Sequence, residues 1–337
     1  MVRAAIPNIE PMEALAVREI PDGPGWQYEP KWDGFRCLAF RDGKGLEMLS
    51  KSGRPLGRYF PEIEEALLAL TPRRFVLDGE LVVPIDGVFS FEDLQLRLHP
   101  ARSRVNKLAA GSPAEYLVFD LLIDERGRAI AELPLSERRP KLEAFAAAHL
   151  PAHPRLKLSP VTTDVAQARK WLAARSLGQD GVIAKRTDLP YQAGNREGMQ
   201  KVKNIRSADC VVGGFRFASR GDTVGSLLLG LYDDEDLLHH VGFTSSFPRD
   251  ERDELTAKLR KLQRKRSKER GFTGRAPGAP SRWSTERSAQ WEPLRPELVV
   301  EVTYDHFSGD RFRHGTKFIR WRPDKRPDQC RMDQVRR

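Results

Sequence analysis

Short apolar runs alternate with polar turns over the first two hundred residues, as expected when strands and helices share one domain. Four runs rich in β-branched and aromatic residues predict strands, at 36–41, 75–84, 115–123 and 181–184. Three segments with apolar residues at helical spacing predict helices, at 62–70, 137–149 and 164–175, the last starting with an N-cap aspartate. The pattern indicates a mixed α+β domain.

The pattern changes after Lys203. Short strands punctuated by glycine follow in the runs VVGGFRF, GSLLLGLYD and LLHHVGF, which is typical of a small β-barrel. We therefore expect a boundary within 203–207, with a first domain of residues 1–203 and a second of residues 204–337. In the second domain we predict a basic amphipathic helix over 255–270, a loop over 271–281, and a final strand over 297–302 before an Arg-rich tail.

The composition is that of a globular protein. Hydrophobic residues make up 39% and charged residues 31%, and no apolar run approaches membrane-spanning length. Proline and glutamate interrupt the N-terminal run MVRAAIPNIEPMEALAV, which argues against a signal peptide. The three cysteines are far apart, so a disulfide framework or a zinc site is not expected. We expect a monomer in the cytoplasm, associated with the nucleoid if the source is bacterial.

The net charge of the chain bears on its binding partner. A formal charge of +10 and a pI of about 9.6 suggest a polyanionic partner. The excess is local, because lysine and arginine far outnumber Glu269 and Glu286 between Leu255 and Arg287. A solvated helix face accounts for such a run equally well, so charge alone leaves the choice open.

The sharpest chemical signal is the run Lys31-Trp32-Asp33-Gly34-Phe35-Arg36, which has the form KxDGxR. A lysine can be a covalent nucleophile only as the neutral amine, so nearby positive charge or loss of water must lower its pKa. Taken alone, the motif fits a surface turn, with Gly34 permitting the bend, better than it fits catalysis.

Further segments follow in an order and spacing that resemble the covalent nucleotidyltransferases, the superfamily of DNA ligases, RNA ligases and capping enzymes. They are SKSG at 50–53, LDGE at 77–80, VFD at 118–120, DGVIAK at 180–185 and KVK at 201–203. The closing run RWRPDK at 320–325 resembles the RxDK element of ATP-dependent DNA ligases, and RHGTKFIRWRPDK resembles the small stand-alone bacterial ligases of the ligase C type. Each segment alone could be an ordinary strand or turn, but their common order favours the family.

The resemblance implies an α+β nucleotidyltransferase domain followed by an all-β OB-fold barrel domain that closes over the nucleotide and later clamps DNA. It implies an ATP-dependent DNA ligase of DNA repair that uses Mg²⁺, with Mn²⁺ as a substitute. Lys31 would receive AMP and pass it to the 5′-phosphate of a nicked duplex DNA, and the 3′-hydroxyl would then displace AMP. Repair polymerases and end-binding proteins are candidate further partners.

The same resemblance assigns roles to individual residues. Catalysis by Lys31 would be assisted by the cations Lys185, Lys201, Lys203, Arg322 and Lys325. Nucleotide contacts would come from Glu29, Arg36, Lys51, Glu80, Phe119 and Ile183. Metal contacts would come from Asp33, Glu80 and Asp180. DNA contacts would come from Lys261, Arg264, Lys265, Arg266 and Lys268.

Three positions depart from the family pattern. Lys51 stands where arginine is more usual, Asp180 replaces the usual glutamate, and Met199 stands where tryptophan commonly precedes the fifth element. The exchange at position 51 replaces a bidentate contact by a point charge. The alternatives are an RNA ligase or capping-type nucleotidyltransferase of the same superfamily, and, in a different class, a catalytically silent DNA-binding module. The RPDK ending and the length favour a DNA ligase.

Overall fold

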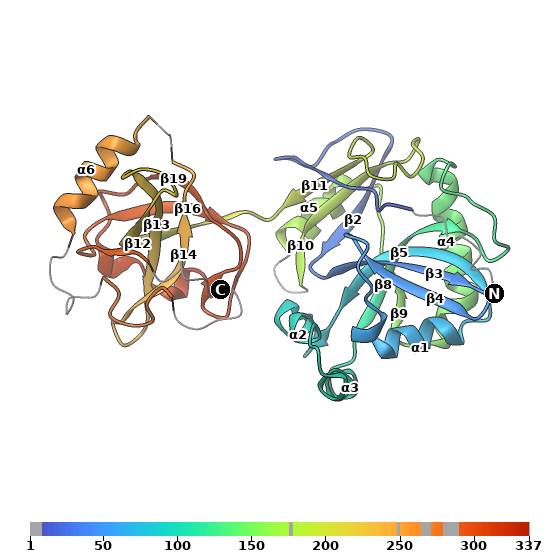
Figure 1. The fold of residues 1–337 in the computed structure, drawn as a ribbon. Helices are drawn as coiled ribbons and strands as arrows, with labels where there is room; N and C mark the ends of the chain where they lie inside the picture. Colours follow the sequence, from blue (N-terminus) through green and yellow to red (C-terminus); the bar gives the residue numbers. More distant parts are fainter. Residues whose placement is uncertain (1–8, 175–177, 248–249, 264–270, 279–289, 337) are drawn as a thin grey trace. The chain divides into compact units, whose positions relative to one another are not determined.

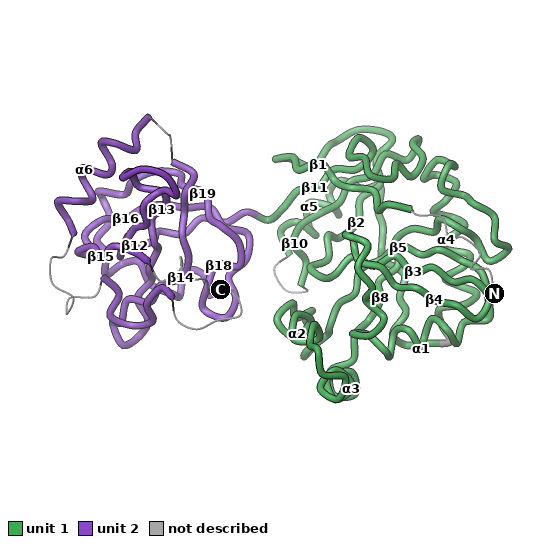
Figure 2. The backbone as a smooth tube through the Cα atoms, in the orientation of Figure 1, with its two compact units in different colours: residues 1–204 green, residues 205–337 purple. Residues whose placement is uncertain are grey.

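The computed structural model describes residues 9–174, 178–247, 250–263, 271–278 and 290–336. The chain divides into two compact units, Met1–Asn204 and Ile205–Arg337, which Figure 2 shows in different colours. The first unit is α+β and the second is rich in β-strands, as the predicted fold class requires. In the described part of the chain, no helix has both the length and the apolar surface needed to span a bilayer.

The first unit is built mainly on two larger sheets (Figure 1). The five-stranded sheet has the order β4 (Gly45–Ser50), β3 (Phe35–Asp42), β5 (Arg74–Val82), β8 (Glu115–Ile123) and β9 (Leu156–Leu158), and only β9 joins its neighbour in parallel. The four-stranded sheet has the order β1 (Leu15–Ala16), β11 (Met199–Lys203), β10 (Gln179–Arg186) and β2 (Trp26–Trp32).

Helices cover one face of each sheet because their apolar residues repeat at helical spacing. α1 (Pro61–Ala69) and α4 (Leu135–His149) bury Ile63, Leu67 and Phe145 in the core of the larger sheet. α5 (Val165–Ala173) packs on the smaller sheet, and the side chain of Asp164 caps it by accepting from the Ala166 amide at 2.8 Å. A third apolar cluster, with Leu38 and Phe40 of β3 and Met199 of β11, joins the two sheets.

The predicted elements of this unit are confirmed with small shifts at their ends. The strand predicted over 115–123 is β8, and the helices predicted over 62–70 and 137–149 are α1 and α4. Several short elements carried no sequence signal. They are β1, β9, the pair β6 (Pro84–Ile85) and β7 (Val88–Phe89), and the helices α2 (Phe91–Leu96) and α3 (Arg102–Gly111).

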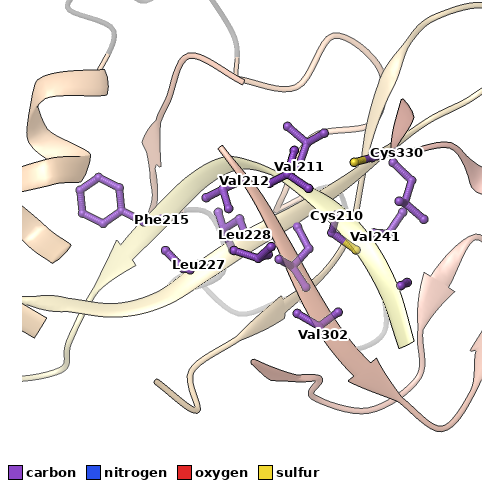
Figure 3. Close-up of a cluster of buried hydrophobic side chains, with 14 of the residues drawn as sticks. Cys210, Val211, Val212, Phe215, Leu227, Leu228, Val241, Val302 and Cys330 are labelled. Atoms are coloured by element: carbon purple, nitrogen blue, oxygen red, sulfur yellow. The ribbon is translucent and has the colours of Figure 1, made fainter. Parts of the chain in front are cut away.

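The second unit is built on a six-stranded sheet. Its strands are β14 (Leu238–Thr244), β13 (Val224–Tyr232), β12 (Arg206–Phe217), β16 (Val299–Tyr304) and β19 (Lys317–Trp321), with β15 (Glu292–Pro293) paired to β12. A bridge between Thr244 and Thr316 draws the two outer strands together, so the sheet curls towards a barrel. Figure 3 shows its core, where Val212, Phe215 and Leu228 are fully buried.

Two predictions for this unit are wrong. The strand predicted over 297–302 is β16, but it is not the last, because β17 (Phe307–Ser308), β18 (Arg311–Phe312) and β19 follow within the basic tail. Lys317 and Arg320 dilute the apolar pattern of β19, and its pairing with β16 is a tertiary contact. The helix predicted over 255–270 is α6 (Arg252–Leu262), which ends where Gln263 adopts an extended backbone, and residues 264–270 lie outside the described residues.

Candidate active site

A cavity of about 200 Å³ is lined by both sheets of the first unit. The smaller sheet contributes β2, β10 and β11, and the larger sheet contributes β3 and β8. The predicted site residues on its wall are Glu29, Lys31, Arg36, Lys51, Phe119, Ile183, Lys185 and Lys201. They come from segments that lie between positions 29 and 201 of the sequence, and the fold brings them together.

Lys31 lies near the end of β2, opposite Gly181 of β10. Its amine donates a hydrogen bond to the carboxylate of Asp180, and the Lys203 amine lies 3.5 Å from the same oxygen. The Asp180 side chain is 4% exposed, whereas the Lys31 side chain is 21% exposed. One buried carboxylate therefore holds two cations, and the Lys31 amine remains accessible from the cavity.

Two glycines of the motifs are required by packing. A Cβ on Gly34 would lie 2.3 Å from the Leu81 carbonyl oxygen, because the turn between β2 and β3 passes directly against β5. A Cβ on Gly181 would lie 2.0 Å from the Val202 carbonyl oxygen, and its φ of +148° is one that side chains disfavour. Each glycine thus allows the strands that carry the charged residues to approach closely.

The ring of Phe119 in β8 is contacted by two cations. The Arg36 guanidinium carbon and the Lys185 amine each lie 4.6 Å from its centroid. The Lys185 amine also lies 2.8 Å from the Glu29 carboxylate, which accepts a hydrogen bond of 3.0 Å from Gln27. An aromatic face bordered by cations is the kind of surface that binds a purine base next to its phosphates.

Arg36 is held in a fixed orientation by Asp78. Its Nε and Nη2 each donate to the Asp78 carboxylate at 2.5 Å, and the Tyr191 hydroxyl donates to the same carboxylate at 2.6 Å. The Met12 amide donates to the Tyr191 oxygen at 2.9 Å. Burial of Arg36 disfavours its charge, but the Asp78 carboxylate outweighs burial and raises the pKa of Arg36. Arg36 is therefore a fully charged and oriented group.

The pKa values of Glu80 and Lys201 are shifted as well. Burial raises the pKa of Glu80 to about 7, although the charges of Arg36 and Lys31 oppose the shift. Burial lowers the pKa of Lys201, and the nearby charges of Lys31 and Lys51 act in the same direction. Shifted pKa values of this kind gather where a protein performs chemistry on charged groups.

The N-terminal segment before β1 is part of the site, which sequence reasoning missed. Met12, Glu13 and Ala14 line the cavity, and β1 joins β11 in parallel. The Glu13 carboxylate lies 2.7 Å from the Lys51 amine and 2.6 Å from Arg196. The hydrogen bond from Lys51, followed by that from Arg196, lowers the pKa of Glu13 to about 2. A two-residue strand has no periodicity, so no local signal marks this segment.

Met199, one of the three departures from the family pattern, lies in the wall of the cavity. Its side chain is 3% exposed, lines the cavity and packs in the cluster that joins the two sheets. A residue of another shape at this position would therefore change the cavity wall directly.

The predicted metal ligands are Asp33, Glu80 and Asp180. The described residues contain no cluster of three or more histidine, cysteine or carboxylate side chains able to hold a metal ion by themselves. Asp180 is engaged by Lys31 and Lys203. Oxygen donors are nevertheless what Mg²⁺ prefers, and that ion commonly takes most of its ligands from phosphates and water. None of the three lines the cavity, so their role as metal ligands stays a prediction.

The remaining predicted residues belong to the second unit. The Asp209 carboxylate accepts from Arg322 at 2.8 Å and from Lys325 at 2.7 Å, and Arg322 also binds Asp324. These two cations are thus held by one acidic residue of β12. Lys261 lies in the last turn of α6. The others lie outside the described residues, namely Arg264, Lys265, Arg266 and Lys268.

Two family models match the chain. Residues 11–203 match the ATP dependent DNA ligase domain, and residues 220–325 match the ATP dependent DNA ligase C terminal region. The chain is 46% identical to DNA ligase C2 of Mycolicibacterium smegmatis, an alignment that covers 98% of this chain and 95% of that protein. It is 42% identical to DNA ligase C of Mycobacterium tuberculosis, with the same coverage.

A solved structure gives the same picture. The mycobacterial DNA ligase D complexed with ATP and MES is 30% identical in sequence and has a TM-score of 0.50, covering 96% of this chain and 98% of that one. The match extends through both units.

Proposed function

This chain belongs to the ATP-dependent DNA ligases, and from that premise we propose that Lys31 is its adenylylated residue and that nicked duplex DNA in repair is its substrate. The Lys31 amine attacks the α-phosphorus of ATP, and the bond to pyrophosphate breaks. An oxygen of the nick 5′-phosphate then takes the AMP and releases the lysine. The 3′-hydroxyl finally attacks that 5′-phosphorus, and AMP leaves.

One observation carries this proposal. The Lys31 amine reaches a cavity whose wall combines the Phe119 ring with Arg36 and Lys185, the two cations that contact it. Phe119 and Ile183 are proposed to flank adenine, while Glu29 contacts the base or ribose and Arg36 the ribose or a phosphate. This arrangement holds the α-phosphorus within reach of one amine, and positioning accounts for most of the rate in phosphoryl-type transfers.

The surrounding cations have separate tasks in this scheme. Lys185, Lys201 and Lys203 offset the negative charge that develops on the transferred phosphate. The Asp180 carboxylate contacts the Lys31 amine and is the base placed to take the proton that Lys31 loses as the N–P bond forms, while Lys203 stays beside the same carboxylate. Arg322 and Lys325 are proposed to orient the departing pyrophosphate, so they assist the first step alone. Mg²⁺, or Mn²⁺ in its place, would offset the charge of the ATP phosphates and be held by Asp33, Glu80 and Asp180 with those phosphates.

The test is labelling with α-³²P-ATP in the absence of DNA. The wild-type chain should form a covalent adduct that nicked duplex DNA discharges, and Lys31→Ala should form none. Lys44→Ala, which removes an exposed lysine of the turn between β3 and β4, is the matched control and should label normally. Persistent labelling of the Lys31→Ala variant would contradict the assignment. Labelling by GTP in place of ATP would support a capping-type activity instead.

A further inference from the structure

Helix α3 carries a positive surface that the proposed reaction does not use. Arg102, Arg104 and Lys107 are exposed, and no acidic residue occurs between Arg97 and Gly111. In the described part of the chain, none of these three side chains has an ion-pair or hydrogen-bond partner, whereas most cations of the cavity are paired. Ser103 and Asn106 on the same helix are also exposed.

The charges of α3 oppose the stability of the helix itself. The amino end of a helix favours acidic side chains, and α1, α2 and α6 all have acidic residues in their first turns. The first turn of α3 has none and instead contains two arginines, while Ala101 at its N-cap provides no side-chain cap. Since helix stability does not explain this charge, a negatively charged partner is the better explanation.

The helix is anchored so that its cations have a defined place. The buried Arg97 guanidinium donates to the Glu62 carboxylate at 2.7 Å and to the carbonyl oxygens of Tyr59 and Ser112. Ser112 ends α3, so this one side chain ties that end of the helix to α1. Near the other end, Arg58 donates to the Pro100 carbonyl at 3.0 Å and adds a fourth exposed cation.

The segment that holds α3 is built on the motif that contains Lys31. The ring of Phe89 in β7 packs edge to face on Trp32 at 5.4 Å, and the ring of Phe91 in α2 packs edge to face on Phe35 at 5.6 Å. Figure 1 shows α2 and α3 following one another at one end of the first unit. The segment that leads into α3 is therefore a direct neighbour of the motif that contains Lys31.

We propose that Arg58, Arg102, Arg104 and Lys107 bind the sugar–phosphate backbone of the duplex beside the nick, so that the first unit holds DNA by a surface of its own. The inference rests on the proposed function because it takes Lys31 as the point that the nick must reach. Arginine, lysine, serine and asparagine are the side chains that most often contact DNA phosphates, and such contacts position a protein without reading sequence.

The expected effect follows from counterion release. Each phosphate contact contributes about 0.9 to the slope of log affinity against log salt, which corresponds to about an eightfold gain in affinity for a tenfold drop in salt. Arg104 and Lys107 are three residues apart and share one side of α3, whereas Arg102, two residues before Arg104, lies in the first turn on another side. Arg104 and Lys107 can therefore meet adjacent phosphates of one strand, and Arg102 and Arg58 extend the positive surface around the start of the helix.

The experiment compares the wild-type chain with a variant carrying Arg102→Gln, Arg104→Gln and Lys107→Gln. Binding to a fluorescent nicked duplex is measured by anisotropy from low to moderate salt. The variant should bind more weakly, and its salt slope should be shallower by about 2 to 3 units. Self-adenylylation without DNA should be unchanged. A second variant with Arg102→Lys and Arg104→Lys keeps the charge and should retain most of the affinity.

The matched control removes the same charge from the same unit. Lys44, Arg73 and Arg126 are exposed in the turns that follow β3, precede β5 and follow β8, and Lys44→Gln, Arg73→Gln and Arg126→Gln should leave nick binding nearly intact. An unchanged salt slope in the α3 variant, or an equal loss in this control, would overturn the proposal. Loss of self-adenylylation or of thermal stability in the α3 variant would assign the helix a structural role instead. Failure of Lys31 to label would refute the proposed function but would not alter the binding comparison.

Discussion

Glu80 should make the first unit less stable as the pH rises, and Glu80→Gln should remove that loss. Glu80 lies on β5 opposite Arg36, and burial raises its pKa from an ordinary value of 4.5 to about 7. Folding therefore binds a proton between these two values, so the free energy of unfolding falls as the pH rises from about 4.5 to about 7 and is level above that. The sign is opposite to that of a carboxylate stabilised by an ion pair.

The magnitude follows from the same shift. One pKa unit corresponds to about 1.4 kcal/mol, so ionising Glu80 costs the fold about 3 kcal/mol at pH 8 and about 1 kcal/mol at pH 5. Glu80→Gln keeps the shape of the side chain without the charge. The variant should be more stable than the wild type by up to about 3 kcal/mol at pH 8, with a much smaller difference at pH 5.

The assay is urea-induced unfolding at pH 5, 6, 7 and 8, with hydrogen exchange of β5 peptides to show that the transition belongs to the first unit. Glu65→Gln, which changes an exposed carboxyl group on α1, is the control. An equal pH dependence of the free energy of unfolding in the wild type and in Glu80→Gln, from pH 5 to pH 8, would contradict the raised pKa of Glu80. Self-adenylylation should fall in Glu80→Gln, since the proposed ribose or metal contact is lost, so stability and activity should change in opposite directions.

Further predictions concern nucleotide and DNA. Phe119→Ala should raise the ATP concentration needed for self-adenylylation by roughly fivefold to 150-fold, from roughly 1–3 kcal/mol of stacking, and an unchanged ATP requirement would make Phe119 a core residue only. Arg322→Ala and Lys325→Ala should lose most self-adenylylation yet seal a nick supplied already adenylylated, because pyrophosphate leaves only in the first step; equal failure in both assays would contradict this. The last prediction concerns the basic residues proposed to contact DNA, namely Lys261, Arg264, Lys265, Arg266 and Lys268. Neutralising them should weaken nick binding and reduce the salt slope of binding by about 0.9 per lost contact, while labelling by ATP continues. Loss of nick binding and labelling together would indicate misfolding.

Local sequence was sufficient to predict those strands and helices whose pattern of apolar and polar residues matches their environment in the fold. β8 reads as a buried strand because both of its faces are covered, and α5 starts at Asp164 because that side chain accepts a backbone hydrogen bond. β19 shows the limit of this reasoning, since its basic residues mask a strand that exists only through its pairing with β16. The prediction for α6 has the opposite error, because it extended the helix along the basic pattern past Gln263, where the backbone becomes extended.

The site residues also fall into those that local motifs predict and those that only the fold identifies. Lys31, Phe119 and Lys185 were predicted because short motifs place a nucleophile, an aromatic ring and a cation in a recognisable order. Glu13 was not, because its role depends on a two-residue strand beside β11 and on ion pairs with Lys51 and Arg196, which are remote in sequence. Motifs report which chemical groups are present, and they report their partners only when those partners are neighbours in the chain.

The sequence by itself determined the family, the order of the two domains and most of the residues that line the cavity, because those features are written as local patterns in a set order. Only the tertiary structure determined which of these charged groups are paired, how they are oriented and how their pKa values are shifted. The pairing of Lys31 with Asp180 and the fixed orientation of Arg36 by Asp78 arise where strands remote in sequence meet. The raised pKa of Glu80 has the same origin. The free energy of a charged group depends on every charge and hydrogen bond around it and on the water that it loses on burial, and that environment exists only once the chain has folded.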